Sequence, residues 1–323
     1  MLSLEPFMKR RDPAQAPLLT LGTMNFGKRT PAAEAIRVIA RATERGVTLF
    51  DTANAYCDGE SERILGRGLK GKRDDVAIAT KVGFGRVGGR SEGLSRERVL
   101  TALDESLTRL GTDHVDVYYL HVPDHQTPLE ETLSAIRTAL DAGKIRAFGV
   151  SNYASHLVVE ILHLCDAEGM PRPIMSQVLY NLLIRQLDLE YAGFARRHAM
   201  HTTVYNALAG GLLTGRHDRG APPQGSRFDG NRLYLGRYWT DRFFDLVDSY
   251  KAVANEEGMT LADLSYAWLA GSDVVDSILL GPASVAQLDS AIDACAKPVS
   301  AEARRAIDSI HVAFMGTATS YAR

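Results

Sequence analysis

The chain has 323 residues, of which 45% are hydrophobic and 24% charged, and its net charge is −2. This composition is ordinary for a globular protein, and so small a charge gives no reason to expect nucleic acid or an anionic membrane as a partner. Cys57, Cys165 and Cys295 are far apart and form no metal-binding or redox spacing, so we expect a cytoplasmic protein without disulfides. The first residues do not resemble a signal peptide, and no apolar run is long enough to span a membrane.

Short apolar segments alternate along the chain with segments of helical periodicity. The first kind predicts buried strands and the second predicts helices. We expect strands at 18–21, 47–50, 76–80, 115–120, 145–150, 174–177, 202–205 and 276–280. We expect helices at 32–45, 61–69, 95–110, 129–142, 155–168, 187–198, 242–257, 261–270, 285–295 and 302–314, and a long loop at about 206–239.

The strict alternation of strand and helix predicts an α/β fold with a parallel sheet. Eight such units in a chain of this length favour a closed (β/α)8 TIM barrel over an open sheet. The alternative, a dinucleotide-binding domain followed by a substrate domain, needs a GxGxxG motif directly after the first strand. Residues 22–28 read GTMNFGK and residues 85–90 read GRVGGR, and neither fits. We expect a flexible loop at 85–90 and one barrel domain over residues 1–323.

Polar residues lie at the C-terminal end of six of the predicted strands. They are Asp51, Lys81, His121, Ser151 with Asn152, Gln177 and Tyr205. In a barrel these ends converge on one mouth, where such proteins keep their sites. Each residue alone has an ordinary explanation, such as a turn cap or a solvated side chain. His121 and His125 have no third ligand at a metal-binding spacing and no HExxH motif, so we expect no metal.

The residues around the second strand suggest proton transfer to a carbonyl oxygen. Tyr56, five residues after Asp51, carries a phenol that can donate a proton. We expect Lys81 to lie near the phenol and lower its pKa, and Asp51 to hold Lys81 charged and in place. His121 can hydrogen-bond the substrate oxygen and orient it. No GxSxG nucleophile is present, so these residues favour reduction by a cofactor that brings the hydride.

Several motifs together resemble the aldo-keto reductase family. They are FDTANAYCDGESERILG (50–66), ATKVG (79–83), YYLHVPDH (118–125), GVSNY (149–153), YNALAGGLLTG (205–215) and LLGPASVAQL (279–288). They cover nearly the whole chain in the family's order. Within the family, HVPDHQTPLEET, LAGGLLTG, GSRFDGN, RYW and the final SYAR are similar to the aflatoxin aldehyde reductase group, which also reduces succinic semialdehyde.

The resemblance implies a role for each matching residue. The residues that match the catalytic tetrad are Asp51, Tyr56 as general acid, Lys81 and His121. The residues that match the cofactor site are Thr23, Asp51, Ser151, Asn152, Gln177, Tyr205, Asn206, Ala207, Leu208, Ala209, Gly210, Gly211, Leu212, Gly215, Arg216, Arg227, Gly281, Ala283, Ser284 and Gln287. The residues that match the substrate side are Tyr56, His121, Tyr234, Arg237 and Arg323. The two guanidinium groups in the last set would suit a substrate carboxylate.

The implied cofactor is NADPH. The resemblance places the nicotinamide carboxamide at Ser151, Asn152 and Gln177, the nicotinamide ring on Tyr205, and the pyrophosphate under 206–216 with Arg227. It places the adenosine 2′-phosphate at 281–287, where a helix N-terminus also favours an anion. Two departures are Ala283, where the family often has a basic or hydroxyl residue, and Ser290-Ala291, where it often has Glu-Asn. NADH use therefore stays open.

The resemblance implies an NADPH-dependent reductase of aldehydes, including dialdehydes or carboxylate-bearing ones such as succinic semialdehyde. One alternative is a ketone or sugar reductase of secondary metabolism on the same fold. Another is a non-catalytic cofactor-binding subunit like the potassium channel β subunits, in which Asn replaces the residue that matches His121. The complete tetrad favours the enzyme. The expected partner is a small carbonyl compound, and the group it resembles usually forms homodimers.

Overall fold

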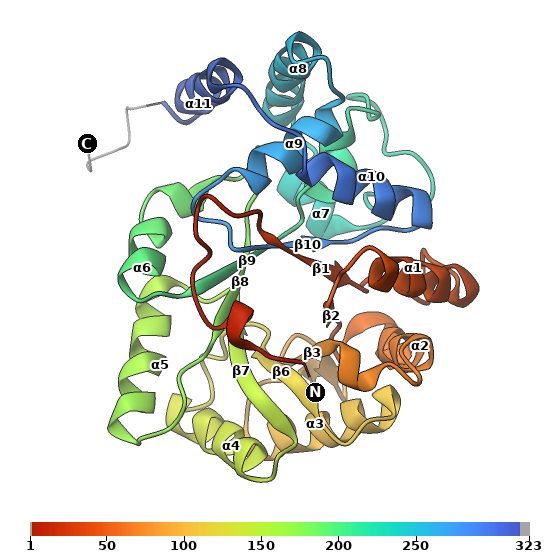
Figure 1. The fold of residues 1–323 in the computed structure, drawn as a ribbon. Helices are drawn as coiled ribbons and strands as arrows, with labels where there is room; N and C mark the ends of the chain where they lie inside the picture. Colours follow the sequence, from red (N-terminus) through yellow and green to blue (C-terminus); the bar gives the residue numbers. More distant parts are fainter. Residues whose placement is uncertain (1, 317–323) are drawn as a thin grey trace.

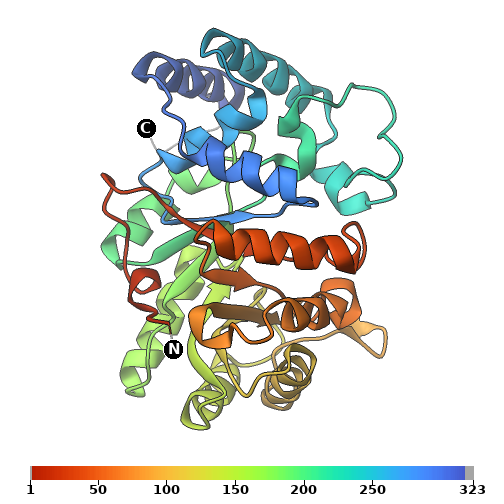
Figure 2. The same ribbon diagram turned by 45° about the vertical axis from the view of Figure 1, so that its right-hand side comes forward.

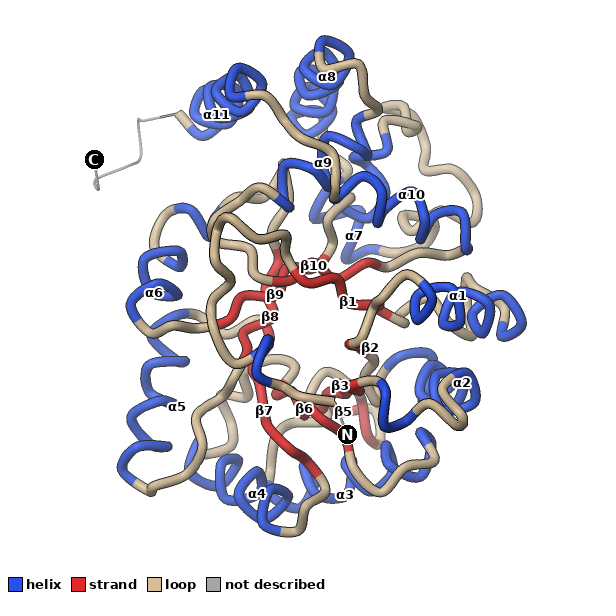
Figure 3. The backbone as a smooth tube through the Cα atoms, in the orientation of Figure 1, coloured by secondary structure: helices blue, strands red, loops and turns tan. Residues whose placement is uncertain are grey.

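The computed structural model describes residues 2–316. Its parallel strands close into a barrel in the order β1-β10-β9-β8-β7-β6-β3-β2, with helices around the ring (Figures 1 and 3). The strands are β1 (Leu18–Gly22), β2 (Leu49–Asp51), β3 (Ala77–Val82), β6 (Val115–Leu120), β7 (Ile145–Ser151), β8 (Met175–Leu179), β9 (His201–Tyr205) and β10 (Ser277–Leu280). The expected (β/α)8 barrel is confirmed.

The helices form an outer layer around the strands (Figure 3). They are α1 (Ala32–Glu44), α2 (Glu60–Gly68), α3 (Arg96–Leu110), α4 (Leu129–Asp141), α5 (Ser155–Ala167), α6 (Tyr191–Arg197), α7 (Arg232–Tyr238), α8 (Asp241–Glu256), α9 (Leu261–Ala270), α10 (Val285–Cys295) and α11 (Ala301–Met315). Side chains cap the N-terminal ends of α3, α7, α8, α9, α10 and α11. For example, the Ser95 side chain accepts the Arg98 N–H at the start of α3, and Gly111, at φ 67°, ends that helix. None of the helices in residues 2–316 is both long and apolar enough to cross a membrane.

The barrel interior is closed at the N-terminal ends of its strands. Side chains of the short helix η1 (Glu5–Phe7) and its neighbour pack against inward-facing strand residues. This inner cluster consists of Leu4, Phe7, Leu49, Ala77, Ala79, Val117, Tyr119, Ala147 and Met175. The N-terminal segment crosses the ring of strands in Figure 1. The open mouth of the barrel therefore lies at the other end, where the strands finish.

Three segments differ from their expected secondary structure. Residues 206–239 are not one loop, because they contain η5 (Ala209–Thr214) and α7. The Asn231 side chain caps α7 by accepting the Tyr234 N–H, and the wide segment between η5 and α7 extends outward in Figure 2. The expected helix at 187–198 is divided into η4 (Gln186–Asp188) and α6. Residues 85–90 contribute to a small hairpin of β4 (Arg86–Val87) and β5 (Arg90–Ser91).

Candidate active site

The polar residues predicted at the strand ends gather at one mouth of the barrel. All eight strands of the closed sheet run parallel, so their C-terminal ends lie on the same side. Asp51 ends β2, Lys81 is the penultimate residue of β3, and His121 directly follows β6. Ser151 pairs with Gln177 in the β7–β8 register.

The centre of the mouth is a buried ion pair between Lys81 and Asp51. Their side chains are 0% and 1% exposed. The Lys81 Nζ contacts Asp51 Oδ1 and also donates to the carbonyl oxygen of Thr52 at 2.8 Å. The other carboxylate oxygen accepts the Gln177 amide N–H at 2.8 Å. Burial raises the pKa of Asp51 and lowers the pKa of Lys81, while each charge opposes the effect of burial on the other.

Tyr56 lies beside this ion pair. The Lys81 Nζ is 5.2 Å from the centroid of the Tyr56 ring. Burial raises the pKa of Tyr56 well above 10, the Asp51 carboxylate adds to this rise, and Arg227 acts in the opposite direction. Burial therefore outweighs the lowering that we expected from Lys81, and the pKa of Tyr56 is raised in the protein alone. The phenol remains protonated and can act as an acid.

A second buried carboxylate, that of Glu62, holds the Arg109 side chain against the turn that carries Tyr56. Tyr56 begins η2 (Tyr56–Gly59), in which Gly59 has φ 81°. The fully buried Glu62 accepts from Thr80 Oγ1 and from Arg109 Nε, both at 2.6 Å. The Arg109 side chain then lies so close to the turn that a Cβ on Gly59 would be 2.5 Å from its Cδ. A larger residue here would have to displace the Arg109 side chain and would adopt a φ that favours glycine.

His121 is buried next to the phenol, and its Nδ1 has no hydrogen-bond partner among residues 2–316. Its ring centroid is 5.8 Å from that of Tyr56 with the planes at 78°, and 5.1 Å from that of Phe84. Burial lowers the pKa of His121 well below 6.5, and the Lys81 charge adds to this effect. A neutral imidazole therefore faces the mouth, where it can exchange a hydrogen bond with a ligand oxygen.

A chain of hydrogen bonds continues around the mouth from β6 to β9. The Asn152 amide donates to the His121 carbonyl oxygen at 2.9 Å and to Ser151 Oγ at 3.0 Å. The Tyr205 hydroxyl donates to Asn152 Oδ1 at 2.7 Å. Asn152 has a φ of 63°, a region that asparagine tolerates better than most residues. These contacts hold four of the predicted residues in one arc.

A group of cations lies at the edge of the mouth, where the segment after η5 meets the loop after β1. Arg227 donates to Asn25 Oδ1 at 2.6 Å, and its guanidinium carbon is 5.2 Å from the Tyr234 ring centroid. Arg237 lies 6.0 Å from the same ring. Burial lowers the pKa of Arg29, and the charge of Arg227 lowers it further. Sequence reasoning missed Asn25 and Arg29, although a polar residue after the first strand was the same signal that identified the other strand ends.

The start of α10 already has partners for several of its free N–H groups. Ser284 Oγ accepts the Gln287 N–H at 3.3 Å, and Gln287 Oε1 accepts the Ala283 N–H at 2.8 Å. The carboxylate of Glu34, from α1, accepts the Val285 N–H at 3.0 Å. An acidic side chain thus occupies part of the region that the resemblance assigns to a 2′-phosphate. No motif pointed to Glu34, because the contact joins two helices far apart in the sequence.

The remaining predicted residues lie around this rim or outside the described part of the chain. The Thr23 hydroxyl is fully buried and lies 2.7 Å from Ser61 Oγ, while the Gly281 carbonyl accepts from Asn25 at 3.1 Å. In and beside η5 are Asn206, Ala207, Leu208, Ala209, Gly210, Gly211, Leu212, Gly215 and Arg216. Arg323 lies outside the described residues. Among residues 2–316, no three His, Cys, Asp or Glu side chains are grouped to bind a metal.

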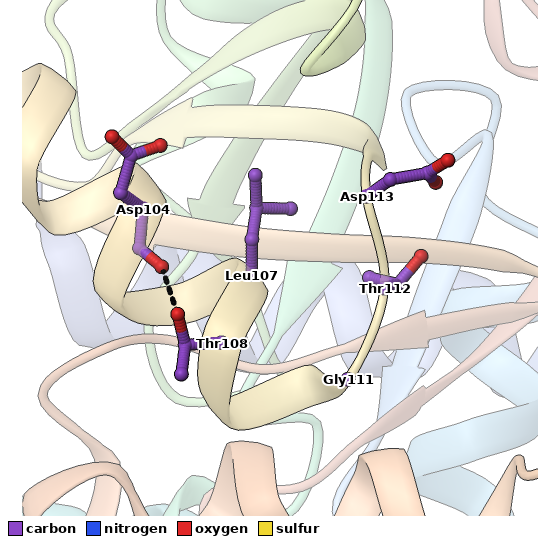
Figure 4. A pocket seen from close by; sticks show the side chains of 6 residues that line it. All are labelled: Asp104, Leu107, Thr108, Gly111, Thr112 and Asp113. Atoms are coloured by element: carbon purple, nitrogen blue, oxygen red, sulfur yellow. Dashed lines mark hydrogen bonds between the residues drawn. The ribbon is translucent and has the colours of Figure 1, made fainter.

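A separate depression lies away from the mouth, where α3 ends and the chain leads into β6 (Figure 4). Its cavity volume is about 810 Å³, and it is lined by Asp104, Leu107, Thr108, Gly111, Thr112 and Asp113. Thr108 Oγ1 donates to the Asp104 carbonyl oxygen at 2.9 Å within the helix. None of the predicted site residues lines this depression, so the candidate site is the mouth of the barrel.

Comparisons with known proteins identify the family of the chain. The chain is 37% identical over 292 residues to aflatoxin B1 aldehyde reductase member 2 of Mus musculus, covering 84% of this chain and 78% of that protein. It is 35% identical over 297 residues to the Homo sapiens protein of that name, covering 86% and 82%. It is also 32% identical over 271 residues to a probable voltage-gated potassium channel subunit beta of Arabidopsis thaliana, covering 82% and 83%. A model of the aldo/keto reductase family matches residues 18–312. The chain belongs to the aldo/keto reductase family.

Proposed function

We propose that this chain reduces aldehydes with NADPH and that Tyr56 is the general acid. The observation that carries the proposal is the arrangement at the mouth: a protonated phenol with the buried Lys81–Asp51 pair on one side and the neutral imidazole of His121 on the other. Relatives named as aldehyde reductases share 35–37% identity with the chain. Membership of the family supports oxidoreductase chemistry on an aldehyde or ketone.

The residues at the rim fit a dinucleotide. In the described structure the hydrogen bonds of Arg227 go to neutral groups, namely Asn25, Tyr234 and the Met24 sulfur, which leaves its charge for a phosphate. Tyr205 offers an aromatic ring for stacking, and a Cβ on Gly281 would meet no atom within 4 Å. When bound, the reduced nicotinamide supplies a hydride to the substrate carbonyl carbon.

The chain's own residues then donate the proton and stabilise the developing negative charge. Tyr56 Oη donates its proton to the carbonyl oxygen, because an alkoxide is a much stronger base than a phenolate. Lys81 stabilises the phenolate that remains, and Asp51 keeps the ammonium group in place. His121 donates a hydrogen bond to the same carbonyl oxygen and orients it. The buried pair is already in position, so it needs little rearrangement during the reaction.

The cations at the rim suggest a negatively charged substrate such as a carboxylate-bearing aldehyde. Arg237 would bind the carboxylate, with Arg323 as the second expected guanidinium. A panel of carbonyl compounds assayed with NADPH tests this proposal, with succinic semialdehyde and 2-carboxybenzaldehyde compared with benzaldehyde and with ketones. Arg237→Ala should raise KM for the carboxylate-bearing aldehydes by about tenfold or more and leave the uncharged ones nearly unchanged. Preference for ketones or sugars would instead support the secondary-metabolite alternative.

A second candidate is a non-catalytic cofactor-binding subunit, which the likeness to a potassium channel subunit beta supports. The imidazole of His121 argues for the enzyme, because it can hydrogen-bond the carbonyl oxygen beside the phenol. NADPH binding without turnover of any compound in the panel would favour the subunit. A homodimer and a cytoplasmic location belong to the same proposal, and light scattering after size exclusion measures the assembly.

A further inference from the structure

The carboxylate of Glu92 joins three segments beside the mouth of the barrel. Its side chain is 2% exposed. Oε2 accepts the backbone N–H groups of Gly83 at 2.8 Å and Gly85 at 3.1 Å. Oε1 accepts Asn54 Nδ2 at 2.6 Å and Arg98 Nε at 2.9 Å. Glu92 thus connects the loop after β3, the loop that leads to the candidate acid, and the first turn of α3.

The two N–H groups on Oε2 flank Phe84, so this carboxylate holds the backbone of Phe84 on both sides. The local chain is adapted to it: Gly83 has φ 109°, and a Cβ on Gly85 would be 2.9 Å from Glu92 Oε2. Phe84 is 54% exposed, and its ring centroid is 5.1 Å from that of His121. A large apolar ring is therefore held beside the imidazole with half of its surface free.

A second carboxylate, that of Asp124, links the same loop to the segment after β6 that contains His121. Asp124, three residues after His121, accepts the Leu94 N–H at 2.8 Å. It also accepts the Thr127 hydroxyl at 2.7 Å. The loop from 83 to 94 is consequently anchored at both ends to segments that carry the candidate acid and the candidate imidazole. Motion of Phe84 relative to His121 is restrained by these anchors.

We infer that Glu92 is a positioning residue that fixes Phe84 beside His121, and that Phe84 gives the site a preference for carbonyl compounds with an apolar ring next to the carbonyl group. The inference rests on the proposed reductase function. An exposed aromatic ring beside polar groups that bind an oxygen is suited to contact the apolar part of a ligand. The ring of such a substrate covers the free surface of Phe84 while its oxygen lies near His121.

The variants are chosen to separate positioning from general folding. Glu92→Gln keeps the size of the side chain but has only one acceptor oxygen. Its NH2 group must therefore face donors, either the N–H groups of Gly83 and Gly85 or those of Asn54 and Arg98. Adding Asn54→Asp restores an acceptor for that NH2 group and should recover part of the loss. Glu105→Gln is the matched control, because Glu105 accepts from Arg98 at 2.7 Å on the exposed side and has no hydrogen bond to residues 83–94 in the described structure. Phe84→Ala removes only the half-exposed ring.

Two measurements on the protein without substrate report the positioning directly. Hydrogen exchange of the amides at 83–85 should accelerate about tenfold or more in Glu92→Gln, recover in part in the double variant, and stay unchanged in Glu105→Gln. The NMR signals of the His121 ring should shift in Phe84→Ala and shift in the same direction in Glu92→Gln. Unchanged exchange and unchanged His121 signals in Glu92→Gln would overturn the positioning role.

The substrate preference is measured as kcat/KM for benzaldehyde divided by kcat/KM for propanal, with NADPH. Phe84→Ala should lower this ratio about fivefold to tenfold, as expected for loss of one aromatic contact. Glu92→Gln should lower it in the same direction, and Glu105→Gln should not. An unchanged ratio in Phe84→Ala would refute the preference while leaving the reductase proposal intact. Absence of turnover with every carbonyl compound would refute the proposed function, and the substrate preference with it.

Discussion

Replacing Lys81 with methionine leaves the Asp51 carboxylate buried without its cation. The two side chains are 0% and 1% exposed, so water cannot take the place of the ammonium group. Gln177 still donates to Asp51 at 2.8 Å, but the Thr52 carbonyl oxygen loses its donor from Lys81. Removing one partner of a buried ion pair costs about 3–5 kcal/mol. We expect Lys81→Met to lower the free energy of unfolding by about that amount at pH 7.

Urea denaturation of the protein without cofactor, followed by circular dichroism, measures this loss. Lys144→Met is the matched control, because the Lys144–Asp104 pair is 40% and 57% exposed and should contribute less than about 1 kcal/mol. The loss in Lys81→Met should be smaller at pH 5 than at pH 8, since burial raises the pKa of Asp51 and a protonated carboxyl group tolerates burial better. Equal losses in the two lysine variants would show that the pair at the mouth is not a buried one.

Three other features give independent predictions. Burial lowers the pKa of His121, so the unfolded chain binds more protons there and stability falls as the pH drops through about 6.5. The unfolding midpoint should therefore decrease more between pH 7 and pH 5 in the wild type than in His121→Gln, and equal decreases would contradict the shift. Glu34→Gln should tighten NADPH relative to NADH about threefold to tenfold, because a like charge at contact distance costs about 1 kcal/mol in a solvated site. Fluorescence titration measures the affinity for NADPH relative to NADH. An unchanged ratio would show that Glu34 does not lie near the bound phosphate. Gly59→Ala should lower stability by about 1–3 kcal/mol and lower kcat, because its Cβ would lie 2.5 Å from Arg109. Gly71→Ala has the same φ of 81° and no atom within 4 Å, and in urea denaturation it should lose less than Gly59→Ala.

The barrel and the location of its mouth could be predicted because the alternation of strands and helices fixes the direction of the strands. Apolar segments ending in Asp51, Lys81 and His121 are separated by helices, which forces the strands to run parallel and brings their ends together. The region from 206 to 239 was harder, because its glycines suggested an unbroken loop. The helix there begins at Arg232, directly after the capping residue Asn231. A single capping side chain is a weak signal when the apolar period that follows is short.

Long-range contacts of single charged residues were not predictable from the sequence. Glu62 looks like an ordinary first-turn residue of a helix, and only the fold brings Arg109 to it. Glu92 follows a short glycine-rich hairpin, and nothing local shows that its carboxylate turns back to bind two backbone N–H groups. The direction of the Tyr56 pKa shift was missed for a related reason. Burial dominates that shift, and burial depends on the whole mouth of the barrel.

Tyr56→Phe tests the central claim most directly, because it removes the proposed acid and leaves the aromatic ring in place. Reduction of an aldehyde by NADPH and cofactor binding by fluorescence titration are measured on the same preparation. We predict that kcat falls by about 10² to 10⁴, while the Kd for NADPH stays within about twofold of the wild-type value because the substitution leaves the cation group at the rim unchanged. Turnover close to the wild-type rate would contradict the assignment of Tyr56 as the general acid.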